Sequence, residues 1–175
     1  IHSLAGCIIA QTPGAKTTHL LTDVPLRRMD LLESILGELP ESATICGGRL
    51  DIPGRKSIDF LKDPFYLAQN AYITAECALD AALPCLTVTL RGCPVLITGW
   101  GRIGKCLADL LKAIGSDVTI AARKEEDRAM IQALGLRAVD YPSLTPLMGQ
   151  FRLIYNTVPE MVLTGKMLEN SCRCS

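Results

Sequence analysis

The chain contains 175 residues, of which 49% are hydrophobic and 21% are charged, so it can bury a core and lacks the composition of a disordered segment. Its 18 Lys and Arg residues balance its 18 Asp and Glu residues, which leaves no basic field for nucleic acid, and no apolar run approaches the roughly 20 residues of a membrane helix. We therefore expect a cytoplasmic protein with no nucleic-acid partner and no membrane segment.

Eight cysteines are scattered along the sequence rather than arranged as a disulfide framework. Most lie in apolar segments, where a reduced cysteine acts as a small hydrophobic side chain. Cys172 and Cys174 are too close together to hold zinc without further ligands, and His2 and His19 show no ligand spacing. We therefore predict no metal site.

The first part of the chain has the pattern of an incomplete α/β domain. The apolar run at residues 5–10 predicts a buried parallel strand, and the loop at residues 11–14 follows at the edge where such sheets bind ligands. The pattern then indicates a helix over Asp30–Leu36 and a strand over Ala43–Cys46. These elements cannot cover their own sheet, so we predict that residues 1–68 are a partial domain whose start is missing.

An alanine-rich segment leads to the second part of the chain. Its composition predicts a helix over Asn70–Leu83, within an interdomain helix and linker at residues 69–90. In a cleft between two domains, Asn70 and Thr74 could hydrogen-bond a substrate carboxylate, and Glu76 could move a proton. The alternative, that these side chains only cap the helix or lie in solvent, is equally compatible with the sequence.

The most informative stretch is a short apolar strand that runs directly into a G-x-G-x-x-G motif. The strand covers Pro94–Thr98, and the motif consists of Gly99, Trp100, Gly101, Arg102, Ile103 and Gly104. The first glycine allows a tight turn, the second lets the backbone approach a pyrophosphate, and the third lets the following helix pack against the strand. Apolar residues recur at helical spacing behind the motif. This context favours a dinucleotide site at the helix N-terminus over a purely structural turn.

The end of the next strand indicates which dinucleotide binds. Residues 117–122 have the pattern of a strand, and Arg123 and Lys124 follow where an NAD-selective enzyme usually places an acid for the ribose hydroxyls. An acid would repel a 2′-phosphate, whereas Arg123 can pair with it through its planar guanidinium and Lys124 adds positive charge. We therefore predict NADP as the cofactor, with NAD possible, against the alternative that both bases form a solvated strand end.

The remaining sequence continues the alternation of helix and strand. We expect a helix over Glu125–Leu134, a strand over Leu136–Val139, a small helix from Ser143 through Met148 and a strand over Arg152–Tyr155.

A loop follows the last of these strands, at the carboxyl edge near the nicotinamide end of a bound dinucleotide. Its residues are Asn156, Thr157, Val158 and Pro159. The predicted fold class is therefore α/β: a partial Rossmann, doubly wound parallel sheet over residues 91–175, incomplete at its C-terminus. Part of a second α/β domain and an interdomain helix precede it.

Several of these stretches, in this order, resemble the Rossmann-type subunit of dipicolinate synthase, a family related to D-isomer 2-hydroxyacid dehydrogenases. The matching stretches are residues 43–48, 69–76, 99–104, 121–123 and 156–159. The resemblance implies NADP-linked oxidation of dihydrodipicolinate to dipicolinate during sporulation, on a small anionic substrate. It also implies a partner, the second and flavoprotein-like subunit of dipicolinate synthase, and we expect an oligomer.

The chain departs from that family at two points. Tyr72 and Ile73 stand where a proline is expected before the threonine, and Cys77 stands where the family tends to have glycine. The sequence also stops at Ser175, before a further strand, a glycine-rich loop and a returning helix of the family. We therefore expect a truncated chain.

Two other functions are compatible with the sequence. The first is a 2-hydroxyacid dehydrogenase or an adenosylhomocysteinase-like enzyme with the same two-domain plan, although neither His2 nor His19 lies in the cofactor half. The second is a module without catalytic activity that binds a nucleotide or another protein chain.

Overall fold

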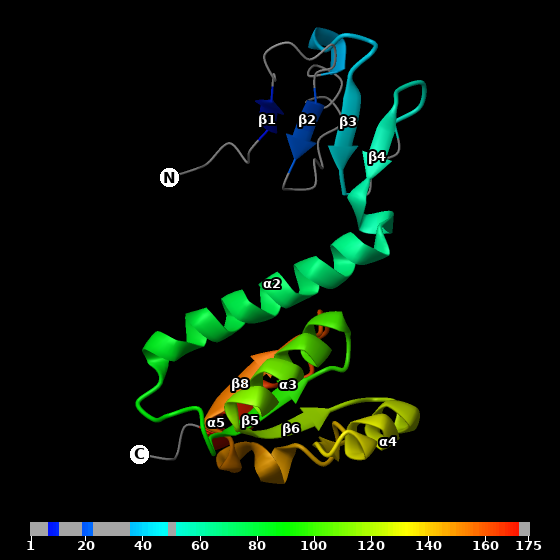
Figure 1. Ribbon diagram of the computed structural model, residues 1–175. Coiled ribbons are helices and arrows are strands. Elements are labelled where there is room, and N and C mark those ends of the chain that lie inside the picture. Colours follow the sequence, from blue (N-terminus) through cyan, green and yellow to red (C-terminus); the bar gives the residue numbers. More distant parts are fainter. Residues whose placement is uncertain (1–6, 11–18, 23–35, 49–51, 172–175) are drawn as a thin grey trace. The chain divides into compact units, whose positions relative to one another are not determined.

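The computed structural model of the chain describes residues 7–10, 19–22, 36–48 and 52–171 (Figure 1). The chain divides into two compact units, residues 1–68 and residues 69–175, and each contains a four-stranded sheet. The loop predicted at residues 11–14 lies outside the described residues, as does the helix predicted over Asp30–Leu36 except for its last residue.

The sheet of the first unit has the strand order β1-β2-β3-β4. Its strands are β1 (Cys7–Ala10), β2 (His19–Thr22), β3 (Thr44–Gly47) and β4 (Ser57–Asp59). β1 pairs antiparallel with β2, whereas the other neighbours are parallel. The prediction of a parallel first strand is wrong, because only residues 11–18 separate β1 from β2 and a parallel crossover needs about a dozen residues.

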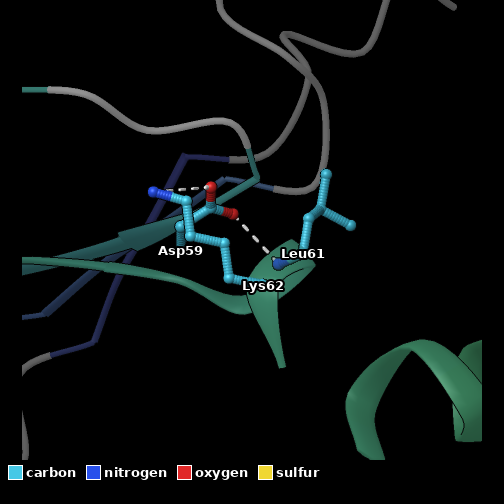
Figure 2. Close-up of polar contacts among 3 residues, drawn as sticks. All are labelled: Asp59, Leu61 and Lys62. Atoms are coloured by element: carbon cyan, nitrogen blue, oxygen red, sulfur yellow. Dashed lines mark hydrogen bonds and ion pairs between the residues drawn. The ribbon is translucent and has the colours of Figure 1, made fainter. Parts of the chain in front are cut away.

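The end of β4 leads into a single 3₁₀ turn, η1 (Phe60–Lys62). The Asp59 carboxylate accepts a hydrogen bond of 3.0 Å from the Leu61 N–H and lies 4.0 Å from the Lys62 ammonium (Figure 2). Asp59 is thus the N-cap residue of η1, the short turn that precedes the long helix.

Helix α2 covers Pro64–Ala82 and ends in a 3₁₀ turn, η2 (Leu83–Cys85). The Asp63 carboxylate accepts hydrogen bonds from the N–H groups of Phe65 at 2.8 Å and Tyr66 at 3.2 Å. A proline at the first helical position costs no hydrogen bond, because the N–H at that position has no partner within the helix. The pair Asp63-Pro64 therefore favours the start of a helix. The prediction that the helix begins at Asn70 is therefore wrong, whereas its C-terminal end is within one residue of the prediction.

The sheet of the second unit has the order β7-β6-β5-β8, and all neighbouring strands are parallel. Its strands are β5 (Pro94–Thr98), β6 (Asp117–Ala121), β7 (Arg137–Val139) and β8 (Leu153–Asn156). Its helices are α3 (Arg102–Ile114), α4 (Glu125–Ala133) and α5 (Gly165–Ser171), with a 3₁₀ segment, η3 (Thr145–Gln150), where a small helix is predicted. This parallel arrangement confirms the predicted α/β fold of Rossmann type.

Alternating residues of β5 divide the core between the two faces of this sheet. Val95 and Ile97 belong to a cluster with Leu107 and Leu111 of α3, whereas Leu96 belongs to a second cluster with Met148 of η3. All are fully buried. A strand covered on both faces is apolar at every position, which explains why the run before the glycines is continuous.

Candidate functional site

The turn after β5 requires a glycine at its first position. Gly99 has a φ of +101°, and its N–H donates to the Ala121 carbonyl of β6 at 2.8 Å. A Cβ on Gly99 would lie 2.6 Å from Val158 Cγ1 and 2.9 Å from Thr157 Oγ1. Both the backbone conformation and the crowding therefore exclude a side chain here.

The third glycine lets α3 approach β5 closely. A Cβ on Gly104 would lie 2.5 Å from the Gly99 carbonyl oxygen, a backbone atom that cannot move aside. A Cβ on Gly101, in contrast, would meet no described heavy atom within 4 Å. Gly101 is also the N-cap residue of α3, so the free N–H groups of the first helical turn adjoin this open space.

Hydrogen bonds of two threonines join the end of β8 and the loop after it to the end of β5. Thr157 donates to the Thr98 carbonyl oxygen through both its N–H, at 3.1 Å, and its Oγ1, at 2.7 Å. The Thr98 hydroxyl donates in turn to Asn156 Oδ1 at 2.6 Å, and Asn156 Nδ2 donates to the Val158 carbonyl at 3.2 Å. The end of β8 and the loop after it are therefore hydrogen-bonded to the last residue of β5, directly before the glycine loop.

A pocket of about 340 Å³ opens between these loops and the end of β6. Its lining comes from four segments: the glycine loop, the residues after β6 with the first turn of α4, the residue two after β7, and the loop after β8. The lining residues are Gly99, Trp100, Gly101, Ala122, Arg123, Lys124, Asp127, Tyr141, Val158, Pro159, Glu160 and Val162. Burial raises the pKa of the Tyr141 phenol above its ordinary value.

Charged groups gather at one side of this pocket. The Arg123 guanidinium forms an ion pair with the Glu160 carboxylate, and 70% and 63% of the two side chains are exposed. Arg128 donates to the carbonyl oxygens of Ala122 at 3.0 Å and Arg123 at 2.7 Å. The backbone that carries Arg123 is therefore held by a second guanidinium, while the Arg123 side chain itself stays accessible.

Seven of the predicted cofactor residues line the pocket, namely Gly99, Trp100, Gly101, Arg123, Lys124, Val158 and Pro159. The other five adjoin the pocket lining in sequence without belonging to it: Asn156 ends β8 and Thr157 follows it, and the first turn of α3 contains Arg102, Ile103 and Gly104. Five lining residues were missed, namely Ala122, Asp127, Tyr141, Glu160 and Val162. Tyr141, Glu160 and Val162 lie in irregular segments without periodicity, whereas Ala122 adjoins the predicted base Arg123 and Asp127 lies in the first turn of α4. Glu160 had one signal, its position directly after the predicted loop.

The predicted catalytic residues lie on α2, and the pocket lining contains no residue of that helix among the described residues. The Thr74 hydroxyl donates to the Asn70 carbonyl oxygen at 2.6 Å, a bond within the helix itself. Asn70 and Glu76 are exposed. A role of Asn70, Thr74 and Glu76 in catalysis stays a prediction.

Within the described residues, no group of three or more His, Cys, Asp or Glu side chains is arranged to hold a metal ion. Across the same part of the chain, no helix combines the length and the apolar character needed to span a membrane.

The model of one protein family matches residues 70–171, from α2 to the end of α5. Its description is "D-isomer specific 2-hydroxyacid dehydrogenase, NAD binding domain". The chain belongs to this family. It is thus a dehydrogenase-like domain of the NAD(P)-binding kind, and the family implies a nucleotide cofactor. The open space at Gly101, beside a helix N-terminus, is compatible with such a group.

Two curated proteins are similar to part of this chain. A dipicolinate synthase subunit of Bacillus subtilis is 26% identical over 116 residues, which are 66% of this chain and 39% of that protein. Glutamyl-tRNA reductase of a Sulfurovum species is 28% identical over 109 residues, 59% of this chain and 25% of the reductase. This chain therefore spans well under half the length of either relative.

A solved structure supports the fold. The crystal structure of a dipicolinate synthase subunit from Bacillus halodurans superimposes with a TM-score of 0.68 at 21% identity, over 79% of this chain and 50% of that one. The predicted resemblance to this protein is confirmed as a distant similarity that covers part of each relative.

Proposed function

We propose that this chain carries the NADP-binding part of an oxidoreductase of the dipicolinate synthase kind. The observation that carries the proposal is the position of Arg123 and Lys124, which follow β6 and line the same pocket as Gly99 and Gly101. In Rossmann domains, the side chain at this strand end selects the cofactor at its adenosine ribose. A basic pair there suits a 2′-phosphate.

Different residues of the pocket would bind different parts of the nucleotide. The N–H groups at the start of α3 would hold the pyrophosphate, and Gly101 leaves room for it. Arg123 and Lys124 would hold the 2′-phosphate, and Val158, Pro159 and Tyr141 would cover apolar surface. A nicotinamide cofactor held by these residues would supply hydride-transfer chemistry.

The reaction and the partners follow from the resemblance. The substrate would be dihydrodipicolinate, a small anion that is oxidised to dipicolinate, and the partner would be the flavoprotein-like subunit of dipicolinate synthase in an oligomeric assembly. On α2, Asn70 and Thr74 would orient the substrate carboxylate, and Glu76 would take up a proton. The family description favours a second candidate, oxidation of a 2-hydroxy acid, which substrate assays of a full-length relative would separate from the first.

Nucleotide titration tests the cofactor proposal. Trp100, the single tryptophan of the chain, lines the pocket, so its emission reports binding directly. We expect NADP to bind more tightly than NAD, and Arg123→Ala to weaken NADP binding by about 1.5–3 kcal/mol, or roughly one to two decades. Arg137→Ala removes the same charge from the start of β7, at the amino end of the parallel strands and outside the pocket lining, and is the matched control. Equal affinities for the two nucleotides in the wild type would refute NADP selectivity.

A further inference from the structure

Glu160 occupies the pocket wall directly beside the base that should bind the 2′-phosphate. Its carboxylate is ion-paired with the Arg123 guanidinium, across 37 residues of sequence. Arg123, Glu160 and Tyr141 line the same pocket. The Tyr141 pKa is raised by burial, lowered by the positive charge of Arg123 and raised by the negative charge of Glu160. Glu160 is therefore part of the pocket and not a distant surface charge.

The charges of the pocket lining cancel. The ionisable side chains with charge at neutral pH are Arg123, Lys124, Asp127 and Glu160, two of each sign. A phosphate monoester carries a charge of about −1.5 to −2 at neutral pH. It would need the guanidinium that Glu160 occupies, and it would be repelled by that same carboxylate.

The Arg123–Glu160 pair can exchange partners readily. Both side chains are mostly exposed, and exposed ion pairs contribute little to stability because water competes for both charges. The Arg123 backbone, in contrast, is fixed by the two hydrogen bonds from Arg128. The guanidinium can therefore turn from carboxylate to phosphate while its attachment point stays in place.

We propose that Glu160 is a specificity-determining residue that competes with the 2′-phosphate of NADP for Arg123 and so restrains the preference for NADP over NAD. The proposal rests on the proposed function, because it concerns the same pocket. Cofactor selectivity would then depend on two residues, Arg123 shortly after β6 and Glu160 in the loop after β8.

The test is a double-mutant cycle on the full chain, with NADP and NAD as the probes at low salt. Releasing the Arg123 guanidinium from this exposed ion pair should tighten NADP binding by up to about five-fold in Glu160→Gln and change NAD binding less than about two-fold. In the Arg123→Ala background, the same substitution should have a clearly smaller effect, since no guanidinium remains to be released. Glu126→Gln, an exposed acid in the first turn of α4 that does not line the pocket, is the matched control.

Three results would overturn the inference. Glu160→Gln could leave the NADP affinity unchanged, it could weaken NAD binding because the carboxylate accepts from the ribose hydroxyls, or Glu126→Gln could produce the same gain. If Arg123→Ala lowers NADP affinity and Glu160→Gln has no effect, only this inference fails. If Arg123→Ala itself has no effect on NADP binding, the proposed function fails.

Discussion

The Tyr72 hydroxyl donates a hydrogen bond of 2.6 Å to the Asp109 carboxylate. This bond joins α2 to α3, the helix that starts at the glycine loop (Figure 1). On the same helix, Ala75 is fully buried in the same core cluster as Leu107 and Ala108 of α3. Helix α2, which carries the predicted catalytic side chains, thus packs against and hydrogen-bonds to α3, the helix that would hold the pyrophosphate.

We expect Tyr72→Phe to loosen this contact in a pH-dependent way. The hydrogen bond to Asp109, followed by the charge of that carboxylate, raises the Tyr72 pKa above 10.0. A raised pKa stabilises the fold below the unfolded value of about 10, and this contribution is lost as the pH rises through the folded value. The melting temperature of the wild type should therefore exceed that of Tyr72→Phe at pH 7–9, and the difference should begin to shrink as the pH rises above about 10.

Circular dichroism melts across this pH range provide the measurement. Tyr66→Phe is the matched control, because Tyr66 lies on the same helix with 39% exposure against 40% for Tyr72. A difference between wild type and Tyr72→Phe that persists unchanged at pH 11 would contradict the assignment.

Substitutions of two glycines should separate folding from binding. Gly104→Ala places a Cβ against the Gly99 carbonyl oxygen, so we expect a loss of stability of about 1–3 kcal/mol from overpacking. Gly101→Ala has open space around it, and its φ of −78° suits alanine, so stability should fall by less than about 1 kcal/mol, the value of a poorer N-cap. Its methyl group would nevertheless occupy the space that the pyrophosphate needs.

Chemical denaturation and Trp100 fluorescence titration of the same two variants give the two readouts. Gly101→Ala should keep nearly the wild-type stability and lose nucleotide affinity. Gly104→Ala should have a lower free energy of unfolding than Gly101→Ala. Wild-type affinity for NADP in a folded Gly101→Ala variant would show that the phosphates lie elsewhere.

Glu76 can be tested in a full-length relative that carries the matching glutamate. If it moves a proton, Glu76→Gln should lower kcat by about 10²-fold or more and leave the Kd for NADP unchanged. Asp80→Asn, one turn further along α2, controls for the loss of an exposed negative charge on this helix. Unchanged turnover in Glu76→Gln would leave the residue as a solvated helix charge.

The second unit could be predicted almost element by element, because local and tertiary signals coincide there. The strand before Gly99 is apolar on both faces, and α3 has a clear apolar stripe that ends at a glycine with positive φ, Gly115. The first unit lacked such agreement. β2 contains two apolar residues between polar ones and β4 contains one, which is too few for a recognisable strand pattern.

The site residues that directly follow strands could be predicted from the sequence, whereas those in other irregular segments could not. Arg123 was found because it closely follows β6, at a position with a known role. Tyr141 and Val162 line the pocket from irregular segments, and no spacing in the sequence predicts that position. The pairing of Arg123 with Glu160 is a tertiary contact, and the sequence alone shows only two separate charges.

One further consequence follows from the start of α3, where Gly101 is the N-cap residue and no described side chain forms a capping bond. Serine, threonine, aspartate or asparagine would ordinarily accept from the first N–H groups at such a position. A nucleotide phosphate bound there would act as a removable cap, so ligand occupancy and folding would be thermodynamically linked. At a free concentration of 100 times its Kd, such a ligand would add about 2.7 kcal/mol to the free energy of unfolding. The melting temperature of this chain would then act as a gauge of how much reduced or oxidised nucleotide surrounds it.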